Sequence, residues 1–513
     1  MGNSPDIETD NRIRDVVIVG GGTAGWMAAA ALAKHLAPMN VRIRLVESEA
    51  IATVGVGEAT VPPIMDFIRQ LGIAEDELVS AIRATFKLGI AYRDWTRPGD
   101  FYFHPFGPTS AGMGAVSFPA YWLKMFLAGK AARLEEYSVQ AVAAAQNKFM
   151  RPVHAPNTPL NKITYALHFD ASLFAAYLSR FAQARGVERI AGTVCAVSLR
   201  GEDGFIESLT LENGETLTAD LFIDCSGFGA RLIGDALDVG FDDWSRWLPC
   251  DRAMVAHSAP AESPAPYTLV TARPAGWQWR IPLQHRTGNG YVFCDAHISE
   301  DEASRLLLER LDGEPLTDPK ILRFTAGKRR LGWVKNCLAV GLSSGFLEPL
   351  ESTSIHLIQV AIMKLLELWP MRTVNPILID QYNRELDLVY DHVRDFIIAH
   401  YKVTDRDDTP FWQYCRNMTV PDSLAAKLEL FRERGETRMA PGDLFSETSW
   451  FAVLYGQGLV PRSYHPIANA LPADELQVVL AKVGAAIKQR VDSLPSHAAF
   501  IERCCAARPP HAA

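Results

Sequence analysis

The chain begins its ordered part with a short apolar run, a glycine turn and a longer alanine-rich stretch. Residues 15–36 read DVVIVGGGTAGWMAAAALAKHL, and VRIRLVES follows at 41–48. Short apolar runs bounded by glycines are typical of buried strands, and the alanine-rich segment is typical of a helix. The pattern therefore predicts an opening β-α-β unit, with order from about Ile13 and a disordered segment over 1–12.

The hydrophobic pattern changes twice further along the chain. Residues 165–186 place apolar side chains on one side of a helical period, which predicts a helix. Residues 188–227 alternate apolar and polar positions around the turn sequences EDG and NG, which predicts a meander of strands. From Ile355 to about Leu494 the apolar spacing is mainly helical. This order of elements predicts the α/β class with a helical region near the end.

A glycine-rich fingerprint joins the first predicted strand to the first predicted helix. Gly20 allows a tight turn, Gly22 lets backbone amides approach a pyrophosphate, and Gly25 lets helix and strand pack closely. Glu47 closes the second strand about 20 residues further on, where a carboxylate can accept hydrogen bonds from a ribose diol. The motif predicts dinucleotide binding by Gly20, Gly22, Thr23, Ala24, Gly25 and Glu47.

A second strand followed by glycine favours FAD over NAD as the dinucleotide. The sequence ADLFIDCSG at 219–227 is the kind of strand that FAD proteins of this topology place under the cofactor, with Asp224 and Gly227 at its carboxyl end. The sequence contains no second fingerprint for NAD(P)H. We therefore expect a flavin that receives its electrons from elsewhere.

Composition and charge exclude several other classes of protein. Of 513 residues, 48% are apolar, and the net charge of −8 argues against binding to nucleic acid or an anionic membrane. The eight cysteines form no C-x-x-C pair and no zinc-like spacing, so we expect no metal site and reduced thiols, as in a cytoplasmic protein. A polar N-terminus and the lack of a long apolar run indicate neither a signal peptide nor a membrane span.

A pair of tryptophans followed by a proline is the most specific signal in the chain. Trp277 and Trp279 lie on one face of a predicted strand that ends at Pro282. Such a pair alone would as readily cover a hydrophobic core, but W-x-W-x-I-P with the glycine fingerprint resembles the flavin-dependent tryptophan halogenases. Other stretches that resemble this family, in the same order, are VGVGEATVPP (54–63), ATFKLGI (84–90), HFD (168–170), DCSGF (224–228) and GFLEPLESTSI (345–355).

The resemblance implies a Rossmann-like FAD-binding fold of the flavin monooxygenase type, with β-sheets and a largely helical substrate-facing region. We expect the FAD-binding module over 13–360, with substrate-facing segments inserted at about 90–160. Residues 361–500 are expected to form a mainly helical region that closes the substrate site, and 501–513 a loose tail. The chain is compatible with a homodimer.

The family's chemistry implies several partner molecules. An NAD(P)H-dependent flavin reductase supplies reduced FAD, which reacts with O2, and a halide ion, chloride or bromide, is oxidised to hypohalous acid. The acid then passes through a tunnel to a lysine beside a separate site for an electron-rich aromatic such as indole or tryptophan. Within the family's motifs, Lys87 matches that lysine. Without the resemblance, a solvent-facing lysine would be the simpler reading.

Lys87 and Glu351 are the residues expected to carry the reaction. Burial in an apolar tunnel should lower the pKa of Lys87, which helps it to polarise the acid or to form a haloamine. Glu351, with Ser352 beside it, is expected to stabilise the cationic ring intermediate and to remove the ring proton. A helix beginning at about Ser352 would offer unpaired backbone amides at Thr353 and Ser354 to the halide.

The resemblance also places residues around the flavin and between the two sites. The stretch at 54–63 would link them. Further cofactor contacts are expected from Val54, Glu58, Ala59, Leu342 and Gly345. The partition that keeps organic molecules away from the flavin would consist of Trp277, Trp279, Ile281 and Pro282.

His104 and Phe106 match a pair that flanks the indole in tryptophan-acting members, and Trp450 is a third expected wall of the substrate site. No match to the family's clamp for the amino-acid groups is evident, so indole or another arene is as reasonable a substrate as tryptophan. Two other functions remain open from sequence. One is a flavin-dependent aromatic hydroxylase, and the other is a flavin-binding protein without catalysis.

Overall fold

The computed structural model describes residues 11–48, 58–109, 116–155 and 158–507. Its first unit is the predicted β-α-β crossover, with β1 (Asp15–Val19) parallel to β2 (Arg42–Glu47) and α1 (Thr23–His35) between them. The six-stranded sheet around this unit has the order β20-β21-β12-β1-β2-β8. Its other strands are β8 (Glu188–Ala191), β12 (Leu221–Asp224), β20 (Trp333–Val334) and β21 (Cys337–Ala339). The predicted α/β class is confirmed.

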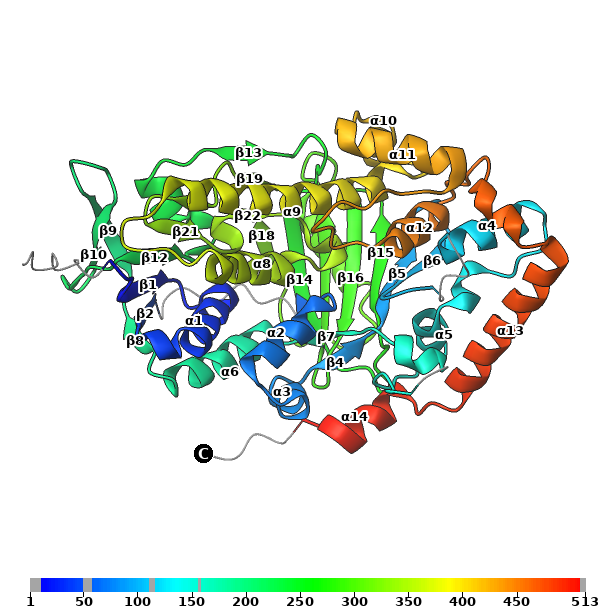
Figure 1. The fold of residues 1–513 in the computed structure, drawn as a ribbon, viewed down its shortest axis with the longest axis horizontal. Helices are drawn as coiled ribbons and strands as arrows, with labels where there is room; N and C mark the ends of the chain where they lie inside the picture. The colour runs from blue at the N-terminus through cyan, green and yellow to red at the C-terminus, as the bar shows by residue number, and fades with distance from the viewer. Residues whose placement is uncertain (1–10, 49–57, 110–115, 156–157, 508–513) are drawn as a thin grey trace, which may run out of the picture.

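A seven-stranded sheet stands in the middle of the molecule (Figure 1). Its order is β18-β14-β17-β16-β15-β5-β6, and its middle strands are antiparallel. The strands are β5 (Gly89–Arg93), β6 (Phe101–Pro105), β14 (Arg252–Ser258), β15 (Thr268–Arg273), β16 (Gly276–Pro282), β17 (Thr287–Phe293) and β18 (Lys320–Arg323). The W-x-W-x-I-P motif therefore lies in the centre of this sheet.

Three smaller sheets complete the β structure. The sheet β3-β7-β4 consists of β3 (Glu58–Ala59), β7 (Ala166–Phe169) and β4 (Thr85–Lys87), with Lys87 opposite Ala166. The other two sheets are β11-β10-β9, made of β9 (Val194–Leu199), β10 (Ile206–Leu211) and β11 (Thr216–Leu217), and β13-β19-β22, made of β13 (Phe241–Asp243), β19 (Gly327–Arg329) and β22 (Gly345–Phe346).

The C-terminal part of the chain is mainly helical, as predicted. The long helix α9 (Pro376–Lys402) runs beside α8 (Ser354–Glu367) and continues towards α10–α12 at the far end of the molecule (Figure 1). Asn375 caps α9 by accepting a hydrogen bond from the Ile377 amide, and Pro376 suits the first helical position. The later helices are α10 (Pro410–Asn417), α11 (Asp422–Arg434), α12 (Glu447–Gly456), α13 (Ala473–Asp492) and α14 (His497–Cys505).

The remaining helices cover the sheets. Helix α1 packs against α6 and α8, and α12 packs against β6. These helices are α2 (Pro63–Leu71), α3 (Glu75–Ala81), α4 (Phe118–Leu127), α5 (Val139–Ala145), α6 (Ala171–Gln183) and α7 (Glu300–Leu308).

Three expectations about element boundaries were wrong. The helix predicted over 165–186 is a strand, β7, followed by α6, because Asp170 ends the strand and caps the helix by accepting the Ser172 amide. Only β9, β10 and β11 form the predicted meander, while β8 and β12 join the parallel sheet. The loose tail expected over 501–513 was wrong for residues 501–505, which belong to α14.

Candidate active site

A cavity of about 580 Å³ begins at the glycine turn after β1. Gly20 has φ of +114°, and a Cβ there would lie 2.1 Å from the carbonyl oxygen of Cys225. A Cβ on Gly25 would lie 1.8 Å from the carbonyl oxygen of Gly20, so α1 approaches β1 closely only because both positions are glycine. Thr23 and Ala24 at the start of α1 line this cavity together with Glu47, whose carboxylate also accepts a hydrogen bond from Nε1 of Trp26 at 3.2 Å and pairs with Arg189.

Most of the predicted cofactor contacts line this cavity, and a few do not. Those in the lining are Gly20, Gly22, Thr23, Ala24, Glu47, Gly227, Leu342 and Gly345. Gly25 acts through packing, and Ala59 is buried outside the lining. Val54 lies outside the described residues, and for Glu58 the structure describes only the backbone, paired with Phe169.

Asp224 is not a contact of the cavity, although its position suggested one. Its buried carboxylate accepts hydrogen bonds from the amides of Ser226, Leu232 and Ile233, at 3.0, 2.8 and 2.9 Å. The side chain therefore holds the turn that brings Ser226 and Gly227 to the cavity, and it has little capacity left for a ligand.

The other end of the cavity reaches the start of α8. Leu342, Leu347, Pro349 and Ser354 line it there, with Trp279 on the side of the seven-stranded sheet. The helix begins at Ser354, two residues later than expected, because Ser352 adopts a left-handed conformation with φ of +60°. The first amides of α8 have no acceptor within the helix, so an anion near Ser354 would meet unpaired donors.

Lys87 lies inside the protein, at the end of β4. Its Nζ donates hydrogen bonds to the carbonyl oxygen of Thr60 at 3.0 Å and to Oγ of Ser352 at 2.9 Å, and it stands 5.1 Å from the ring centre of Phe106. The side chain is fully buried. Burial lowers the pKa of Lys87 to about 7, against the opposing charge of Glu351, so a large share of the amine is neutral at neutral pH.

Glu351 is buried beside Ser352 and contacts three side chains from distant elements. Tyr92 donates a hydrogen bond to its Oε1 at 2.5 Å, His104 Nδ1 lies 3.1 Å from Oε2, and His400 Nε2 lies 2.9 Å from Oε1. Burial would raise the pKa of Glu351, but the charge and hydrogen bonding of His104, and then of His400, hold it well below its usual range. The sequence pointed to His104 as an aromatic wall, whereas here it is also a partner of the carboxylate.

His400 of α9 lies between a backbone carbonyl of its own helix and the carboxylate of Glu351. Its Nδ1 lies 2.8 Å from the carbonyl oxygen of Phe396, one helical turn earlier in α9, so Nδ1 carries a hydrogen. Its Nε2 then faces Oε1 of Glu351 at a distance too short for two lone pairs. The two atoms are thus within ion-pair distance, although the contact lacks the angle of a well-formed hydrogen bond.

The tryptophan pair of β16 reaches the cavity through Trp279, and Nε1 of Trp277 donates a hydrogen bond to Glu348. Trp277 and Trp279 lie on the same side of β16, with ring centres 5.8 Å apart, and Trp279 lines the cavity. The carbonyl oxygen of Pro282 accepts a hydrogen bond from Thr85 in β4, the strand that carries Lys87. Ile281 of β16 is also buried, outside the cavity lining.

Comparison with known proteins agrees with this geometry. The tryptophan halogenase family model matches residues 15–473. The chain is 36% identical to tryptophan 6-halogenase ThaL of Streptomyces albogriseolus over 526 aligned positions, covering 95% of this chain and 98% of that protein. The chain belongs to the tryptophan halogenase family. It is accordingly a flavin-dependent halogenase, an oxidoreductase that uses FAD, and a separate flavin reductase is the usual arrangement in this family.

Solved structures of other flavin-dependent halogenases share the whole fold. Xcc4156 from Xanthomonas campestris superposes with a TM-score of 0.94 at 44% identity, covering 97% of this chain and all of that one. BrvH from Brevundimonas sp. BAL3 gives 0.92 at 47% identity, covering 96% and 99%. The expected family and fold are confirmed, and the hydroxylase alternative is disfavoured.

Trp450 approaches the ring of His104 through Phe396. Its ring packs edge-on against Phe396, with ring centres 4.8 Å apart, and Phe396 in turn lies 5.6 Å from the ring of His104. Trp450 is buried and its indole also faces the ammonium of Lys427 at 4.3 Å. Trp450 therefore packs against Phe396, which lies next to the ring of His104.

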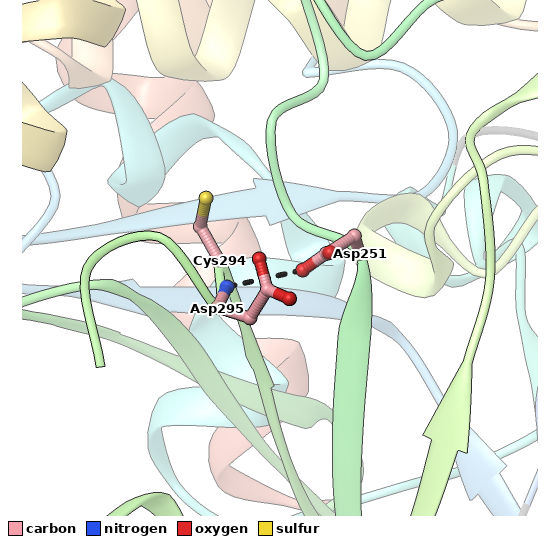
Figure 2. A group of neighbouring side chains, drawn as sticks. All are labelled: Asp251, Cys294 and Asp295. Carbon is pink, nitrogen blue, oxygen red and sulfur yellow. Dashed lines mark hydrogen bonds between the residues drawn. The ribbon is translucent and has the colours of Figure 1, made fainter. Parts of the chain in front are cut away.

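One group of possible metal ligands occurs in the described residues, and none of its three members is in the lining of the halogenase's cavity (Figure 2). Asp251 accepts the backbone amide of Asp295 at 3.1 Å, and the possible ligand atoms of the three residues lie within 4.8 Å of one another. Arg252 pairs with Asp251 and Asp295, each at 2.7 Å. The two carboxylates thus share one guanidinium, which satisfies them in part without a metal ion.

No helix in the described ranges combines the length and apolarity that crossing a membrane requires.

Proposed function

We propose that this halogenase transfers an oxidised halogen through Lys87 to an electron-rich arene held against Glu351. Supporting this proposal, Lys87 donates to Ser352, the neighbour of Glu351, while Ser354 two positions on lines the FAD cavity. One short stretch of chain thus connects the cavity with a buried amine and a buried carboxylate. That connection is the observation on which the proposal rests.

The cavity suits FAD. The glycine turn, the ribose-binding position of Glu47 and the start of α8 lie along one continuous space. Bound reduced FAD supplies, with O2, the oxidising power that converts a halide ion into hypohalous acid. We propose that the amides at Thr353 and Ser354 bind the halide, because the start of α8 carries partial positive charge and Ser354 faces the cavity.

The chain's own residues then divide the work at the buried site. Neutral Lys87 is a nucleophile or hydrogen-bond partner for the incoming acid, and Ser352 fixes its direction. Ionised Glu351 stabilises positive charge on the attacked ring and accepts the ring proton. Phe106, beside Lys87, and His104 are the proposed walls for the arene. Indole is the simplest arene of this kind, and tryptophan is the substrate named for several relatives.

We also propose that the residues inserted at about 90–160 and those at 361–500 form the substrate side, since Tyr92, His104 and His400 all come from these segments. The free cysteines among the described residues support a cytoplasmic setting.

The decisive experiment is product mass after incubation with FAD, a flavin reductase, NADH, bromide and indole. One added bromine supports the proposal. One added oxygen would indicate hydroxylation, and no product over a broad panel of arenes would indicate a flavin protein without this activity.

A further inference from the structure

Glu348 is a second buried carboxylate, three positions before Glu351, for which the proposed chemistry has no use. Its Oε1 accepts a hydrogen bond from Nε1 of Trp277 at 3.1 Å and another from the hydroxyl of Tyr401 at 2.6 Å. The side chain is completely buried. One oxygen atom therefore joins the tryptophan pair of β16 to the end of α9.

The surroundings of Glu348 are costly for a carboxylate. In the described part of the chain no lysine or arginine forms an ion pair with it, and its Oε2 is buried without a hydrogen-bond partner. Burial raises the pKa of Glu348 to about 7, despite the two hydrogen bonds. A leucine would fill such a place at less cost, so the carboxylate calls for a specific role.

The position of Glu348 connects both halves of the proposed site. Its chain neighbours Leu347 and Pro349 line the FAD cavity. Through Trp277 it holds the partner of Trp279, which forms the cavity wall. Through Tyr401 it holds the residue next to His400, which contacts Glu351. The loop that carries Glu348 therefore contacts both the tryptophan pair at the cavity wall and the helix that carries His400.

We propose that Glu348 is a positioning residue whose Oε1 locks Trp277 and Tyr401 in one geometry and so keeps the halogenating oxidant from escaping before it reaches the arene. This inference rests on the proposed function. Glu348 touches neither the cavity nor Lys87, so its loss should not change FAD binding or the consumption of reduced flavin. It should change where the oxidant goes.

The first test compares Glu348→Leu with Glu348→Gln, because glutamine keeps an acceptor oxygen for both donors. Halogenated indole and hypohalous acid trapped in bulk by monochlorodimedone are measured per NADH consumed, and the FAD dissociation constant is measured by flavin fluorescence. We expect the trapped fraction to rise at least threefold in Glu348→Leu and to stay within twofold of wild type in Glu348→Gln, with FAD affinity unchanged in both.

Tyr401→Phe removes one donor without emptying the site, and Tyr382→Phe is its matched control on the same helix, bonded only weakly to the Ala361 carbonyl at 3.4 Å. Tyr401→Phe should leak oxidant and Tyr382→Phe should not. If Glu348→Leu fails to fold, this pair decides. Equal trapped fractions in Tyr401→Phe and Tyr382→Phe, or a Glu348→Gln variant that leaks as much as Glu348→Leu, would overturn the proposal.

A spectroscopic test separates this inference from the proposed function. The titratable groups that face Glu348 are Tyr401, Tyr92, Cys250 and Cys415, and burial raises the pKa of each well above its usual value. In a Lys87→Met background, which removes the other group with a pKa of about 7, a change in tryptophan fluorescence with a midpoint near pH 7 would report Glu348 through Trp277. It should disappear in Glu348→Gln and Trp277→Phe and persist in Trp122→Phe, whose indole bonds elsewhere.

Persistence of the titration in Glu348→Gln would refute the lock even in an active halogenase. If wild type halogenates nothing, but the Lys87→Met background shows the titration and loses it with Glu348→Gln, the proposed function fails while the lock itself stands.

Discussion

Lys87 and Ser352 are 265 positions apart in the chain, and Nζ of the lysine lies 2.9 Å from Oγ of the serine. The contact requires β4 and the turn before α8 to meet in a fully buried place. Burying the amine of Lys87 costs folding free energy, because the amine loses its hydration there. Such a cost indicates that the lysine is kept for its function. The pair is therefore the natural place to test the halogenation chemistry.

Replacing Lys87 with alanine should abolish halogenation and leave FAD binding within about twofold, because the lysine does not line the cavity. Product mass and flavin fluorescence are the measurements. Lys124→Ala is a matched control, since that ammonium also donates to backbone carbonyls, of Leu471 and Ala468, far from the site. Halogenation retained in Lys87→Ala would remove the lysine from the mechanism.

The pKa of Lys87 also makes a prediction about stability. Burial lowers it from 10.5 to about 7, so between these values the unfolded chain binds more protons than the folded one. Stability linked to Lys87 therefore increases as pH rises through this window, and the cost of the buried lysine is greatest below pH 7. The advantage of Lys87→Met in free energy of unfolding should shrink from pH 6.5 to 10, by on the order of 4 kcal/mol. Urea titrations at several pH values measure it, and a constant difference would contradict the shift.

The glycine turn offers a test of the FAD site that does not depend on turnover. In Gly25→Ala the new methyl group would lie 1.8 Å from the Gly20 carbonyl oxygen, so α1 must move away from β1 and its first turn with it. We expect FAD affinity to fall at least tenfold by flavin fluorescence. Gly201→Ala is the control, since nothing lies within 4 Å of a Cβ there. Equal affinity in both variants would show that the turn is not the cofactor's cradle.

Sequence reasoning reached the parts of the site that follow from local pattern and family resemblance. The glycine turn, Lys87 and Glu351 belong to short motifs, and the structure brings them to one cavity and one buried cluster. The sequence did not predict the roles of Tyr92 in β5 and His400 in α9, which contact Glu351 from elements distant in the chain. No spacing of residues along the sequence predicts such partners, because only the tertiary fold brings them together.

Asp224 shows the opposite limit of sequence reasoning. Its place at the end of a strand predicted a ligand contact. In the structure, backbone amides further along the chain, of Leu232 and Ile233, donate hydrogen bonds to its carboxylate instead. The start of α8 differs for a similar reason. The left-handed turn at Ser352 is a property of the backbone, and serine is not the residue that signals it.

Ser354 provides a test of halide selection. Its side chain stands at the opening of α8, in the cavity lining, beside the amides proposed to bind the halide. Removing the hydroxymethyl group in Ser354→Gly widens this place, which favours the larger ion. We expect the ratio of bromination to chlorination, measured with both halides present, to rise at least twofold. An unchanged ratio would exclude the side chain from halide choice.

The close approach of His400 to Glu351 leads to the last prediction. Because His400, after His104, helps to hold the pKa of Glu351 low, His400→Gln should lower kcat for halogenation while KM for the arene changes little, since the substrate walls remain. Glu351→Gln alone should lower the rate about 10²- to 10⁴-fold, as loss of a general base does. The double variant should then be no slower than Glu351→Gln, since His400 acts through the carboxylate.

His465→Gln, at the protein surface, controls for the histidine change, and single-turnover product formation measures each rate. Two additive losses in the double variant would mean that His400 acts on the arene by a route of its own. Equal rates for His400→Gln and wild type would mean that the two remaining partners, Tyr92 and His104, are sufficient to keep Glu351 ionised.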